Sequence, residues 1–571
     1  MALVEKNYKT PFPKHVKIYI DKIESNPSVV NVERLKLVEY LKNVFMNEKL
    51  YYSEEQIEKY FSYEKYFPYP LFEWERFLFV LHYCVFREDG LPRWSDLFIY
   101  MGRGGGKNYY LSWEDFCAIT PTHGIREYDV DICATSEEQA MTSFNEIYEM
   151  LENTTNPSFK KIFKRNFHWT KTEITNKITN STIKYRTNNA KSKDGLRSGA
   201  LNFDEYHAYD NYDNIRVFTT GLGKKNNPRT TITTTDGDVR GGPLDKKKET
   251  ALDVLYGRAE DNGLLVFMCR LDDEKEVEDV TMWQKANPSL EYRPSLLSQM
   301  KKEYIDYVQD PIGNSAFMTK RMNIPKMSQE HAVTSWENIE ATGKIIGPDG
   351  EIITREVPDL TGLPCVAGID FSSFDDFTSV CLTFKKEGIY YSIKHTWVCS
   401  KSKDLPRIKA PLREWEKIGL LTFVDADEID PHLITDWLLL KKQKYKIMKI
   451  ALDYYRSFMV KSALSDIGWD VNNKDIIKLV RPSDVMLVVG TITSAFNLKN
   501  IVWGGDRLME WATWNAKLEP RANNNYVYGK IEPKSRKTDP FMAFVHSMVL
   551  TLEIDLDIPK TKFISIIKFN K

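Results

Sequence analysis

The sequence predicts an α/β protein built from two unlike domains, a parallel-sheet domain followed by a mixed α/β domain. Between about residues 96 and 235, short β-like runs alternate with helical ones, which is typical of a parallel sheet with crossover helices. After about residue 356 the runs CVAGID, SVCLTF, IYYSIKHTWV and KIALD are strand-like, and the middle two are expected to pair antiparallel. An amphipathic helix beginning near Asp539 completes this second, mixed pattern.

These patterns divide the chain into four parts. Residues 1–50 carry apolar side chains at helical spacing and are expected to form an N-terminal helical segment. Residues 51–270 contain the strand and helix alternation and form the first domain. Residues 271–355 are charged and helical and end in a stretch rich in Gly and Pro, so we interpret them as a linker or lid subdomain. Residues 356–571 form the second domain.

Composition limits the classes of protein that fit. The 571 residues are 42% hydrophobic and 28% charged, with a formal net charge of −1. This near-zero charge gives no global attraction to nucleic acid, so any DNA contact must come from local basic patches. No run of about 18 apolar residues occurs, and the amino terminus lacks an apolar signal core, so secretion and membrane spanning are not expected. The seven cysteines are never spaced C-x-x-C, which favours a reducing cytoplasm over a disulfide framework or a zinc site.

A glycine-rich turn between an apolar strand and a helix is the first chemical signal, in FIYMGRGGGKNYYLSWEDF. The backbone N–H groups of such a turn converge on phosphate oxygens, the following helix N-terminus favours an anion, and Lys107 can reach the β- and γ-phosphates. Met101 replaces the first glycine of the usual phosphate-loop pattern, and Asn108 stands where a Ser or Thr would bind magnesium. The segment alone is also compatible with an ordinary turn.

An acidic pair ends a later strand-like run, in ALNFDEYHAYD. Asp204 and Glu205 therefore lie where a sheet opens onto its ligand, placed to support hydrated Mg²⁺ and to polarise an attacking water. A further strand, TTITTTDGD, ends in hydroxyls at residues 233–235, which can sense the γ-phosphate or belong to an ordinary threonine-rich strand. Together the loop, the acidic pair and this strand predict an ATPase.

Aspartates occupy strand ends and a helix start in the second domain. Asp370 ends CVAGID, Asp453 ends KIMKIALD and Asp539 opens the last helix, while Asp376 follows shortly after the first of them. Acids placed in this way can converge on one sheet edge and hold two Mg²⁺ or Mn²⁺ ions about 3.5–4 Å apart, which activate water on a phosphodiester. Each aspartate alone is also compatible with a helix cap or a solvated loop.

Taken in order, the motifs resemble those of the large terminase subunit of tailed bacteriophages, and the resemblance covers most of the chain. The matching segments are GRGGGK, SEEQA, LNFDEYHAY, TITTTDGD, ANPSL, TKRMNI, GIDFSSFDDFTS, ALDYYRS and KTDPFMA. The resemblance implies a P-loop NTPase parallel-sheet domain followed by an RNase H-like mixed α/β nuclease domain. It implies that ATP hydrolysis pumps DNA through a portal into a procapsid, while a two-metal nuclease cuts concatemeric DNA.

The same resemblance implies roles for individual residues. Lys107 looks like the Walker A lysine, Asp204 like the Walker B acid and Glu205 like the catalytic glutamate, with residues 233–235 as the coupling motif. The other nucleotide-contacting positions that it implies are Arg103, Gly104, Gly105, Gly106, Asn108 and Trp74. The residue after Trp74 is Glu75, where a glutamine is commoner in the family. The implied nuclease metal ligands are Asp370, Asp376, Asp453 and Asp539.

Cofactors and partners follow from the resemblance too. The cofactors are ATP and Mg²⁺, with Mn²⁺ as an alternative ion in the nuclease site. The partners are double-stranded DNA, a portal protein and a small terminase subunit, and no membrane is expected. The chain is expected to form a homo-oligomeric ring on the portal, with a monomer in solution as the alternative state. Its expected location is the bacterial host cytoplasm and, transiently, the procapsid portal.

Arg197 is the candidate for the arginine that a ring ATPase inserts into the site of a neighbouring subunit. It lies in a polar turn that leads into the strand before Asp204, and Arg103 and Arg126 are the alternatives.

Two other functions are open at this point. One is a nucleic-acid translocase or helicase ATPase without nuclease activity, in which the aspartates of the second domain are structural. The other is a non-catalytic virion assembly protein whose degenerate phosphate loop no longer hydrolyses nucleotide. Metal-dependent DNA cleavage argues against the first, and phosphate release argues against the second.

Overall fold

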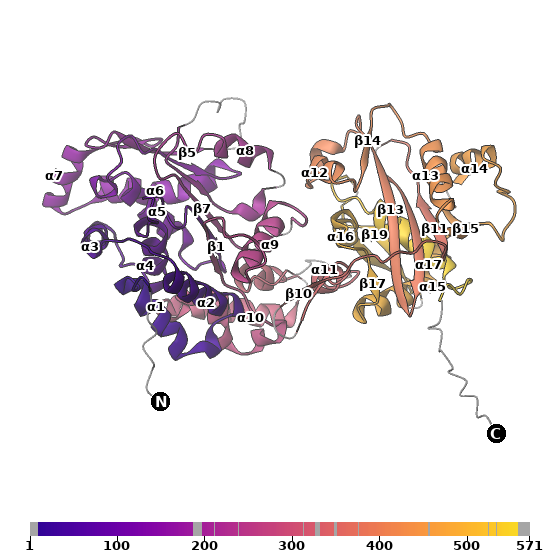
Figure 1. Ribbon diagram of the computed structural model, residues 1–571, viewed down its shortest axis with the longest axis horizontal. Coiled ribbons are helices and arrows are strands. Elements are labelled where there is room, and N and C mark those ends of the chain that lie inside the picture. The colour runs from indigo at the N-terminus through magenta and orange to yellow at the C-terminus, as the bar shows by residue number, and fades with distance from the viewer. Residues whose placement is uncertain are drawn as a thin grey trace, which may run out of the picture. The chain divides into compact units, whose positions relative to one another are not determined.

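The chain folds into two compact units in the computed structural model, Met1–Ser328 and Gln329–Lys571 (Figure 1). The structure describes residues 9–186, 197–209, 212–237, 239–311, 313–325, 332–347, 351–374, 376–454, 457–522, 525–532 and 534–557. Each unit has its own sheet and its own hydrophobic core. The finer division into four parts stays a prediction.

The first unit is built on an eight-stranded sheet in the order β3-β4-β5-β2-β6-β7-β1-β8. Its strands are β1 Asp96–Tyr100, β2 Val130–Cys133, β3 Phe167–Trp169, β4 Ile174–Asn176, β5 Ser181–Arg186, β6 Ala200–Phe203, β7 Arg229–Thr234 and β8 Leu264–Met268. The strands from β5 to β8 pair parallel, which confirms the predicted parallel sheet, while β3 and β4 pair antiparallel at one edge. Because β6, β7 and β1 are neighbours, the loops that follow them meet at one edge of the sheet.

Helices pack on and around this sheet. They are α1 Lys14–Ser25, α2 Val32–Asn47, α3 Glu54–Phe61, α4 Glu73–Phe79, α5 Lys107–Ala118, α6 Glu137–Asn153, α7 Pro157–Asn166, α8 Asp213–Thr219, α9 Pro243–Leu255 and α10 Pro294–Gln309. Helices α1 and α2 lie in the segment predicted to be helical. Leu41 and Phe45 of α2 are fully buried in the same core as Phe98 of β1, so this segment is part of the first unit's core and not a detached appendage.

Residues 271–325 form a small satellite of the first unit. Besides α10 they contain short helical turns at η7 Glu274–Glu278, η8 Val280–Lys285, η9 Pro288–Tyr292 and η10 Phe317–Arg321. Trp283, Met300 and Met318 are fully buried and give this segment a core of its own. The charged helical character predicted for this region is therefore seen as several short turns around one longer helix.

The second unit is built on a mixed sheet in the order β14-β13-β12-β11-β15-β16, with β17 paired to β13. These strands are β11 Pro364–Asp370, β12 Thr378–Lys386, β13 Ile389–Cys399, β14 Thr422–Val424, β15 Lys446–Asp453, β16 Ile477–Val480 and β17 Ile501–Val502. Two hairpins accompany it, β9 Lys344–Ile346 with β10 Ile352–Thr354, and β18 Ala516–Arg521 with β19 Asn525–Lys530. The predicted antiparallel pair β12–β13 is confirmed, and β11 pairs antiparallel with β12 but parallel with β15.

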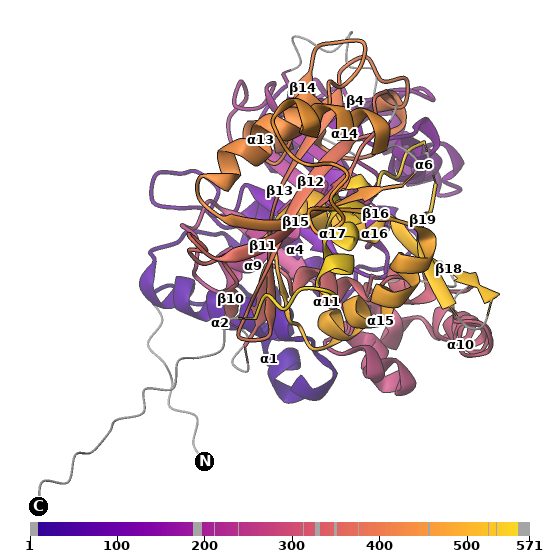
Figure 2. The ribbon, with the colours of Figure 1, turned by 90° about the vertical axis from the view of Figure 1, so that its right-hand side faces the viewer.

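Helices cover both faces of the second sheet. They are α11 Trp336–Glu340, α12 Leu412–Lys417, α13 His432–Lys442, α14 Ser457–Asp466, α15 Pro482–Asn497, α16 Arg507–Trp514 and α17 Asp539–Leu550. Side chains alternate along β11, so Val366 shares a core with α15, α16 and α17, whereas Ala367 shares the other core with α13 and α14. Figure 2 shows α17 beside β15 and β16.

Gly368 explains how closely α17 packs on β11. A Cβ atom at this position would lie 2.1 Å from the carbonyl oxygen of Ala543 in α17. A glycine is therefore needed for the helix to rest on the strand. The contact places the first turn of α17 near the carboxyl end of β11.

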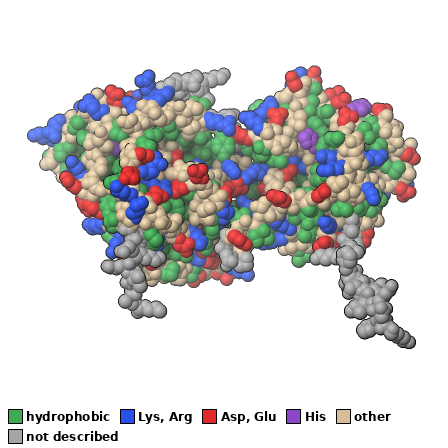
Figure 3. Space-filling view, viewed as in Figure 1, with side chains coloured by type: hydrophobic (Ala, Val, Ile, Leu, Met, Phe, Trp, Pro, Cys, Tyr) green, Lys and Arg blue, Asp and Glu red, His purple; other side chains and the backbone are tan. Residues whose placement is uncertain are grey.

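Positive and negative side chains are mixed on the face of each unit that Figure 3 draws. This agrees with the near-zero net charge of the sequence. Among the described residues, no helix is both long enough and apolar enough to cross a membrane.

Candidate functional site

The glycine-rich turn joins β1 to α5 and has a backbone that only glycines accommodate well. Gly104 and Gly106 have φ angles of 87° and 103°, in the left-handed region that disfavours other residues. A Cβ atom on Gly102 would lie 2.2 Å from the carbonyl oxygen of Arg321. The turn leads directly into the first turn of α5, whose N–H groups have no intrahelical partner. This is the backbone geometry that binds phosphate.

Lys107 begins α5 and folds back over the turn. Its Nζ atom donates to the carbonyl oxygen of Met101 at 2.9 Å, and the side chain is buried. Burial lowers the pKa of Lys107, while the nearby carboxylates of Glu205 and Asp204 act in the opposite direction. The ammonium is thus held between the turn and the acidic pair, where a phosphate would meet it.

Asp204 follows β6 and is fixed by the neighbouring strand. Its Oδ1 atom accepts from Thr233 Oγ1 of β7 at 2.7 Å and from the N–H of Glu205 at 2.9 Å. Its Oδ2 atom is buried without a hydrogen-bond partner among the described residues. Burial and the adjacent Glu205 raise the pKa of Asp204 to about 6. A buried, unsatisfied carboxylate oxygen beside a phosphate turn fits the role of holding a hydrated divalent cation.

Glu205 is held in an unusual backbone conformation. Its φ of 49° is in the left-handed region, which costs a non-glycine residue about 1 kcal/mol or more. Its Oε2 atom lies 3.1 Å from His207 Nδ1. Burial alone would raise the pKa of Glu205, but His207 and the ammonium of Lys107 outweigh it and hold the pKa at about 2. The carboxylate is therefore ionised and lies within the electrostatic reach of the Lys107 ammonium.

The other predicted ATPase residues are placed as follows. Arg103 is exposed in the turn, and its backbone N–H donates to the carbonyl oxygen of Lys320 at 2.7 Å. Asn108 is half-buried in the first turn of α5. Arg197 is exposed just before β6 and forms no ion pair with a described residue. The structure therefore brings Lys107, Asp204 and Glu205 together and leaves Arg197 facing outward.

Trp74 is a buried anchor for the turn. Its side chain is 1% exposed, and its indole N–H donates to Ser289 Oγ at 2.8 Å. Ser289 in turn donates to the carbonyl oxygen of Gly105 at 2.6 Å. Trp74 thus reaches the phosphate turn through a serine and shows little surface to a ligand.

Glu75, next to Trp74, is a fully buried carboxyl group beside the same turn. Its Oε2 atom accepts from the N–H of Phe72 at 2.7 Å, and Oε1 has no hydrogen-bond partner among the described residues. A Cβ atom on Gly106 would lie 3.3 Å from Oε1. Burial raises the pKa of Glu75 to about 8. The side chain is therefore neutral at pH 7, like the glutamine that is commoner here in the family it resembles.

We expect Glu75→Gln to remove the decrease in the free energy of unfolding that the buried carboxyl group causes as pH rises. The folded-state pKa of this acid lies above its unfolded value of about 4.3, so the stability of the wild type falls as pH rises from there to about 8 and then levels off. Unfolding temperatures measured from pH 5 to pH 9 should diverge in favour of the variant up to about pH 8. The exposed Glu55→Gln is the matched control, and parallel curves for Glu75→Gln and wild type would contradict the prediction.

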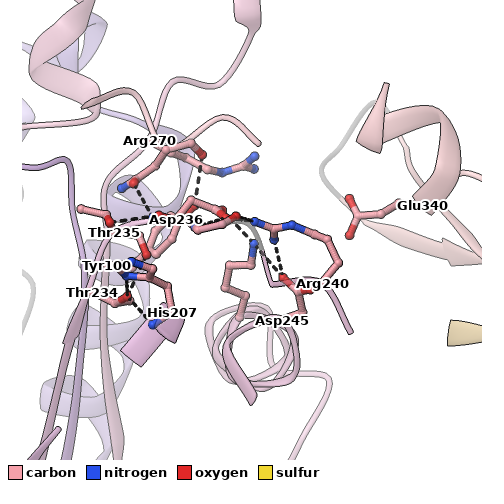
Figure 4. A network of polar contacts seen from close by, with 12 residues as sticks. Tyr100, His207, Thr234, Thr235, Asp236, Arg240, Asp245, Arg270 and Glu340 are labelled. Atoms are coloured by element: carbon pink, nitrogen blue, oxygen red, sulfur yellow. Dashed lines mark hydrogen bonds and ion pairs between the residues drawn. The ribbon is translucent and has the colours of Figure 1, made fainter. Parts of the chain in front are cut away.

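A buried ionic network continues from the end of β7 (Figure 4). Asp236 has no exposed surface, pairs with Arg240, and accepts from Tyr100 at 2.5 Å and Lys248 at 3.0 Å. Arg240 also reaches Asp245 at 2.7 Å, as Figure 4 shows. Burial would raise the pKa of Asp236, but these cations lower it well below its usual range. The network fixes the segment that follows residues 233–235.

In the second unit, three of the predicted acids converge on the face of the sheet that α17 covers. Asp370 ends β11 on the same face as Val366, and Asp453 ends β15 on the same face as Ala451, because side chains alternate along each strand. Strands β11 and β15 are parallel neighbours, so both carboxylates lie at one edge. Asp539 opens α17, which packs on this face.

Two lysines lie among these acids. Lys530, at the end of β19, is 2.9 Å from Asp376 Oδ1 and 3.3 Å from Asp539 Oδ1. Lys537 is fully buried and lies 2.8 Å from Asp376 Oδ1 and 2.7 Å from Asp404 Oδ2. Asp376 therefore joins the cluster as part of a lysine-linked network.

Burial and close charges shift the pKa values of the acids in this cluster. Burial and the neighbouring Asp539 raise the pKa of Asp370 well above its usual range. Burial also raises the pKa of Asp539, against the effect of Lys530. Burial would raise the pKa of Asp376, but Lys530 and Lys537 bring it below its usual value. Asp370 and Asp539 are therefore repelled by neighbouring carboxylates. The negative charge of Asp376 is instead balanced by the two lysines.

The donor set of the cluster fits a divalent cation. Asp539 Oδ2 is buried without a hydrogen-bond partner among the described residues, and hard carboxylate oxygens are what Mg²⁺ and Mn²⁺ prefer. Within the described ranges, no three Asp, Glu, His or Cys side chains are already arranged to hold an ion. The assignment of individual metal ligands therefore stays a prediction.

Sequence reasoning missed several functional neighbours of both sites. They are His207 and Lys320 in the first unit, and Lys530, Lys537 and Asp404 in the second. His207, Lys320 and Lys537 lie inside segments that already match the family, LNFDEYHAY, TKRMNI and KTDPFMA. Position within a matching segment was the available signal. Lys530 and Asp404 lie outside those segments.

Comparison with known proteins identifies the family of both units. Residues 73–252 match the family model of the terminase large subunit ATPase domain, and residues 258–553 match that of the terminase large subunit endonuclease domain. The chain is 23% identical over 371 residues to protein YmfN of Escherichia coli (strain K12), covering 62% of this chain and 77% of YmfN.

The chain also matches solved structures of large terminases. The HK97 bacteriophage large terminase is 17% identical, with a TM-score of 0.44, and the match covers 87% of this chain and all of that one, 100%. The magnesium-bound large terminase nuclease of thermophilic phage G20c is 9% identical, with a TM-score of 0.25, and the match covers 38% of this chain and 97% of that one.

The two family matches define an ATPase joined to a nuclease in one chain. The two alternatives, a translocase without a nuclease and a non-catalytic assembly protein, are set aside because both domain models match. The chain belongs to the terminase large-subunit family and is a DNA-packaging motor subunit with ATPase and endonuclease activity. Membership implies the use of a nucleotide and a divalent metal, and of DNA and packaging partners.

Proposed function

We propose that the first unit binds ATP at the phosphate turn and hydrolyses it with Asp204 and Glu205. Lys107 and the backbone of Gly104, Gly105 and Gly106 bind the phosphates, with Arg103 and Asn108 at the rim. Asp204 would hold a hydrated Mg²⁺ ion, whose charge would offset that of the transferred phosphate. Glu205, ionised and half-buried near Lys107, orients and polarises the attacking water.

Residues 233–235 link this chemistry to the sheet. Thr233 of β7 donates a hydrogen bond to Asp204, so a movement of this carboxylate would also displace β7. Strand β7 continues into the buried network around Asp236. We assign this strand the coupling of hydrolysis to movement.

Arg197 is proposed to act on a neighbouring copy of the chain. Arg197 is exposed just before β6, so its side chain could reach the nucleotide site of a neighbouring subunit. A ring of copies on the portal would provide that neighbour. Arginine fingers of this type can contribute about 10³–10⁵ in rate.

In the second unit, we propose that Asp370, Asp453 and Asp539 hold the catalytic metal, with Asp376 close by. Mg²⁺ or Mn²⁺, as a pair of ions, would activate water and stabilise the leaving oxygen of the phosphodiester. Lys530 and Lys537 place positive charge beside the carboxylates, where the DNA backbone must approach. The substrate is concatemeric double-stranded DNA.

The wider assignment follows from these two sites. The chain works with a portal protein and a small terminase subunit, in the bacterial host cytoplasm and transiently at the procapsid portal. The observation that carries the proposal is that each unit contains the side chains that one of the two reactions requires. These are Lys107 with the acidic pair in the first unit, and the strand-end aspartates in the second.

A DNA-protection assay tests this function. Linear double-stranded DNA is incubated with portal-bearing procapsids, the chain, ATP and Mg²⁺, and packaged DNA is scored as resistant to added nuclease. We expect protection with wild type and none with Lys107→Ala. Asp370→Asn should still protect linear DNA, since packaging of a pre-cut end needs no cleavage. Protection by the Lys107→Ala protein would overturn the proposal.

A further inference from the structure

His207 lies at the meeting point of three segments of the first unit. Its Nδ1 atom is 3.1 Å from Glu205 Oε2 and 3.2 Å from Thr234 Oγ1, and its backbone N–H donates to the same threonine oxygen at 2.9 Å. Its Nε2 atom is 2.9 Å from Lys320 Nζ. The ring therefore touches the catalytic carboxylate, strand β7 and the η10 segment at once.

These contacts fix which ring nitrogen carries the proton. An ammonium group can only donate, so the Nε2 atom facing Lys320 must accept and the proton must be on Nδ1. Thr234 gives the same answer independently. Its hydroxyl donates to the carbonyl oxygen of Thr235 at 2.7 Å, so its oxygen can only accept from His207.

The single Nδ1–H therefore has two acceptors to choose between. In this structure it is aligned on Thr234, and Glu205 Oε2 lies close by without an aligned donor. A small rotation of the Glu205 carboxylate or of the ring transfers the hydrogen bond from the strand to the carboxylate. The orientation of Glu205 and the hydrogen bond to Thr234 of β7 are therefore coupled, because the same N–H can serve only one of them at a time.

The ring has little freedom apart from this choice. A Cβ atom on Gly237 would lie 2.6 Å from His207 Cδ2, so the backbone after β7 packs directly on the imidazole. Lys320 also donates to the carbonyl oxygen of Asp236 at 2.9 Å, which ties its ammonium to the same segment. Figure 4 shows His207 beside Thr234 and the Asp236 network.

The η10 segment, whose Lys320 contacts His207, also forms hydrogen bonds with the phosphate turn. The carbonyl oxygen of Lys320 accepts from the N–H of Arg103 at 2.7 Å, and Arg321 Nη1 donates to the carbonyl oxygen of Arg103 at 2.8 Å. A shift of the turn on nucleotide binding would therefore move Lys320, and through it the imidazole.

We propose that His207, fixed in one tautomer by Lys320, is the positioning residue that orients Glu205 for hydrolysis and links it to the phosphate turn through η10. This rests on the role proposed for Glu205. His207 touches no phosphate itself in the assignment. It acts by presenting one N–H to Oε2, which leaves Oε1 to face the attacking water.

Replacement of the imidazole separates positioning from binding. His207→Ala should lower the kcat of ATP hydrolysis by about 10–100-fold, the cost of a small misplacement of a reacting group, while the Kd of a non-hydrolysable ATP analogue stays within about two-fold. His207→Asn, whose amide N–H occupies the place of Nδ1–H, should recover part of kcat. His207→Gln, which reaches only toward Lys320, should not. The exposed His168→Ala is the matched control.

Lys320→Met tests the link to η10. It should lower kcat on its own, because the ring is released from its tautomer, and should add nothing in the His207→Ala background, since the two act as one unit. Lys302→Met, an exposed lysine of α10, is the control. Full kcat in His207→Ala, additive losses in the double variant, or analogue binding that falls in step with kcat would each overturn the proposal. Normal hydrolysis by Glu205→Gln would instead remove the role of Glu205 itself, so the two failures are distinguishable.

Discussion

Glu205→Gln is expected to reduce ATP hydrolysis by about 10³-fold while leaving ATP binding intact. The amide has the shape of the carboxylate and can place an oxygen at the same distance from His207 Nδ1, but it lacks the negative charge that polarises water. The low pKa of Glu205 means that the wild-type group is ionised throughout the working pH range, so the variant removes charge and not a proton. Phosphate release and analogue binding measure the two effects separately.

Lys107→Ala is the companion variant with a different signature. It removes the buried ammonium that donates to the carbonyl oxygen of Met101 and that is proposed to bind the phosphates. Both the rate of hydrolysis and the affinity for nucleotide should therefore fall. DNA cleavage by both variants should remain near wild type, because the candidate nuclease acids belong to the second unit. Lys302→Ala should leave every activity unchanged. Equal loss of hydrolysis and cleavage in a folded Glu205→Gln protein would argue against two separate sites.

The ATPase site could be predicted from the sequence because its signals are local. A phosphate turn needs glycines at fixed positions, and Gly104 and Gly106 indeed have positive φ angles. The acidic pair follows a buried strand, and strand order then brings it to the turn. The parallel sheet itself could be predicted from the alternation of strand and helix, since that order has few other solutions.

The partners of these residues could not be predicted, because they come from far along the chain. Lys320 meets His207 only because η10 folds back on the edge of the sheet, and nothing in the spacing between them shows this. Trp74 illustrates the opposite case. The family resemblance implied a nucleotide contact for it, which stays a prediction, and the structure shows a buried side chain with a hydrogen bond to Ser289.

Domain limits are marked in the sequence only by turn residues. The Gly- and Pro-rich stretch predicts a boundary near residue 355, which stays a prediction, while the two compact units of the structure are Met1–Ser328 and Gln329–Lys571. The hairpin β9–β10 lies in the second unit, where the N–H of Trp503 donates to the carbonyl oxygen of Thr342 at 2.9 Å. Turn residues mark a change of direction in the chain, and they do not show to which core the turn belongs.

Asp370→Asn is expected to reduce metal-dependent DNA cleavage by more than about 10²-fold. Loss of a group that only supports a metal ligand already costs about 10–100-fold, and loss of a ligand itself should cost more. Cleavage of plasmid DNA in Mg²⁺ or Mn²⁺ measures the effect, with ATP hydrolysis as the internal control. The exposed Asp436→Asn, on α13 at the other face of the sheet, is the matched control.

Stability then separates a metal ligand from a structural aspartate. The pKa of Asp370 in the folded protein lies above its unfolded value, so the ionised group lowers stability as pH rises above that unfolded value. Asparagine removes the charge that Asp539 repels, so without divalent ions Asp370→Asn should unfold at the same or a higher temperature than wild type at pH 8. Added Mn²⁺ should raise the unfolding temperature of wild type and not that of the variant, because only the wild type retains the full set of acids. A variant that is less stable without metal, or that still cleaves DNA, would mean that Asp370 is held in the cluster for packing and that the ion is bound elsewhere.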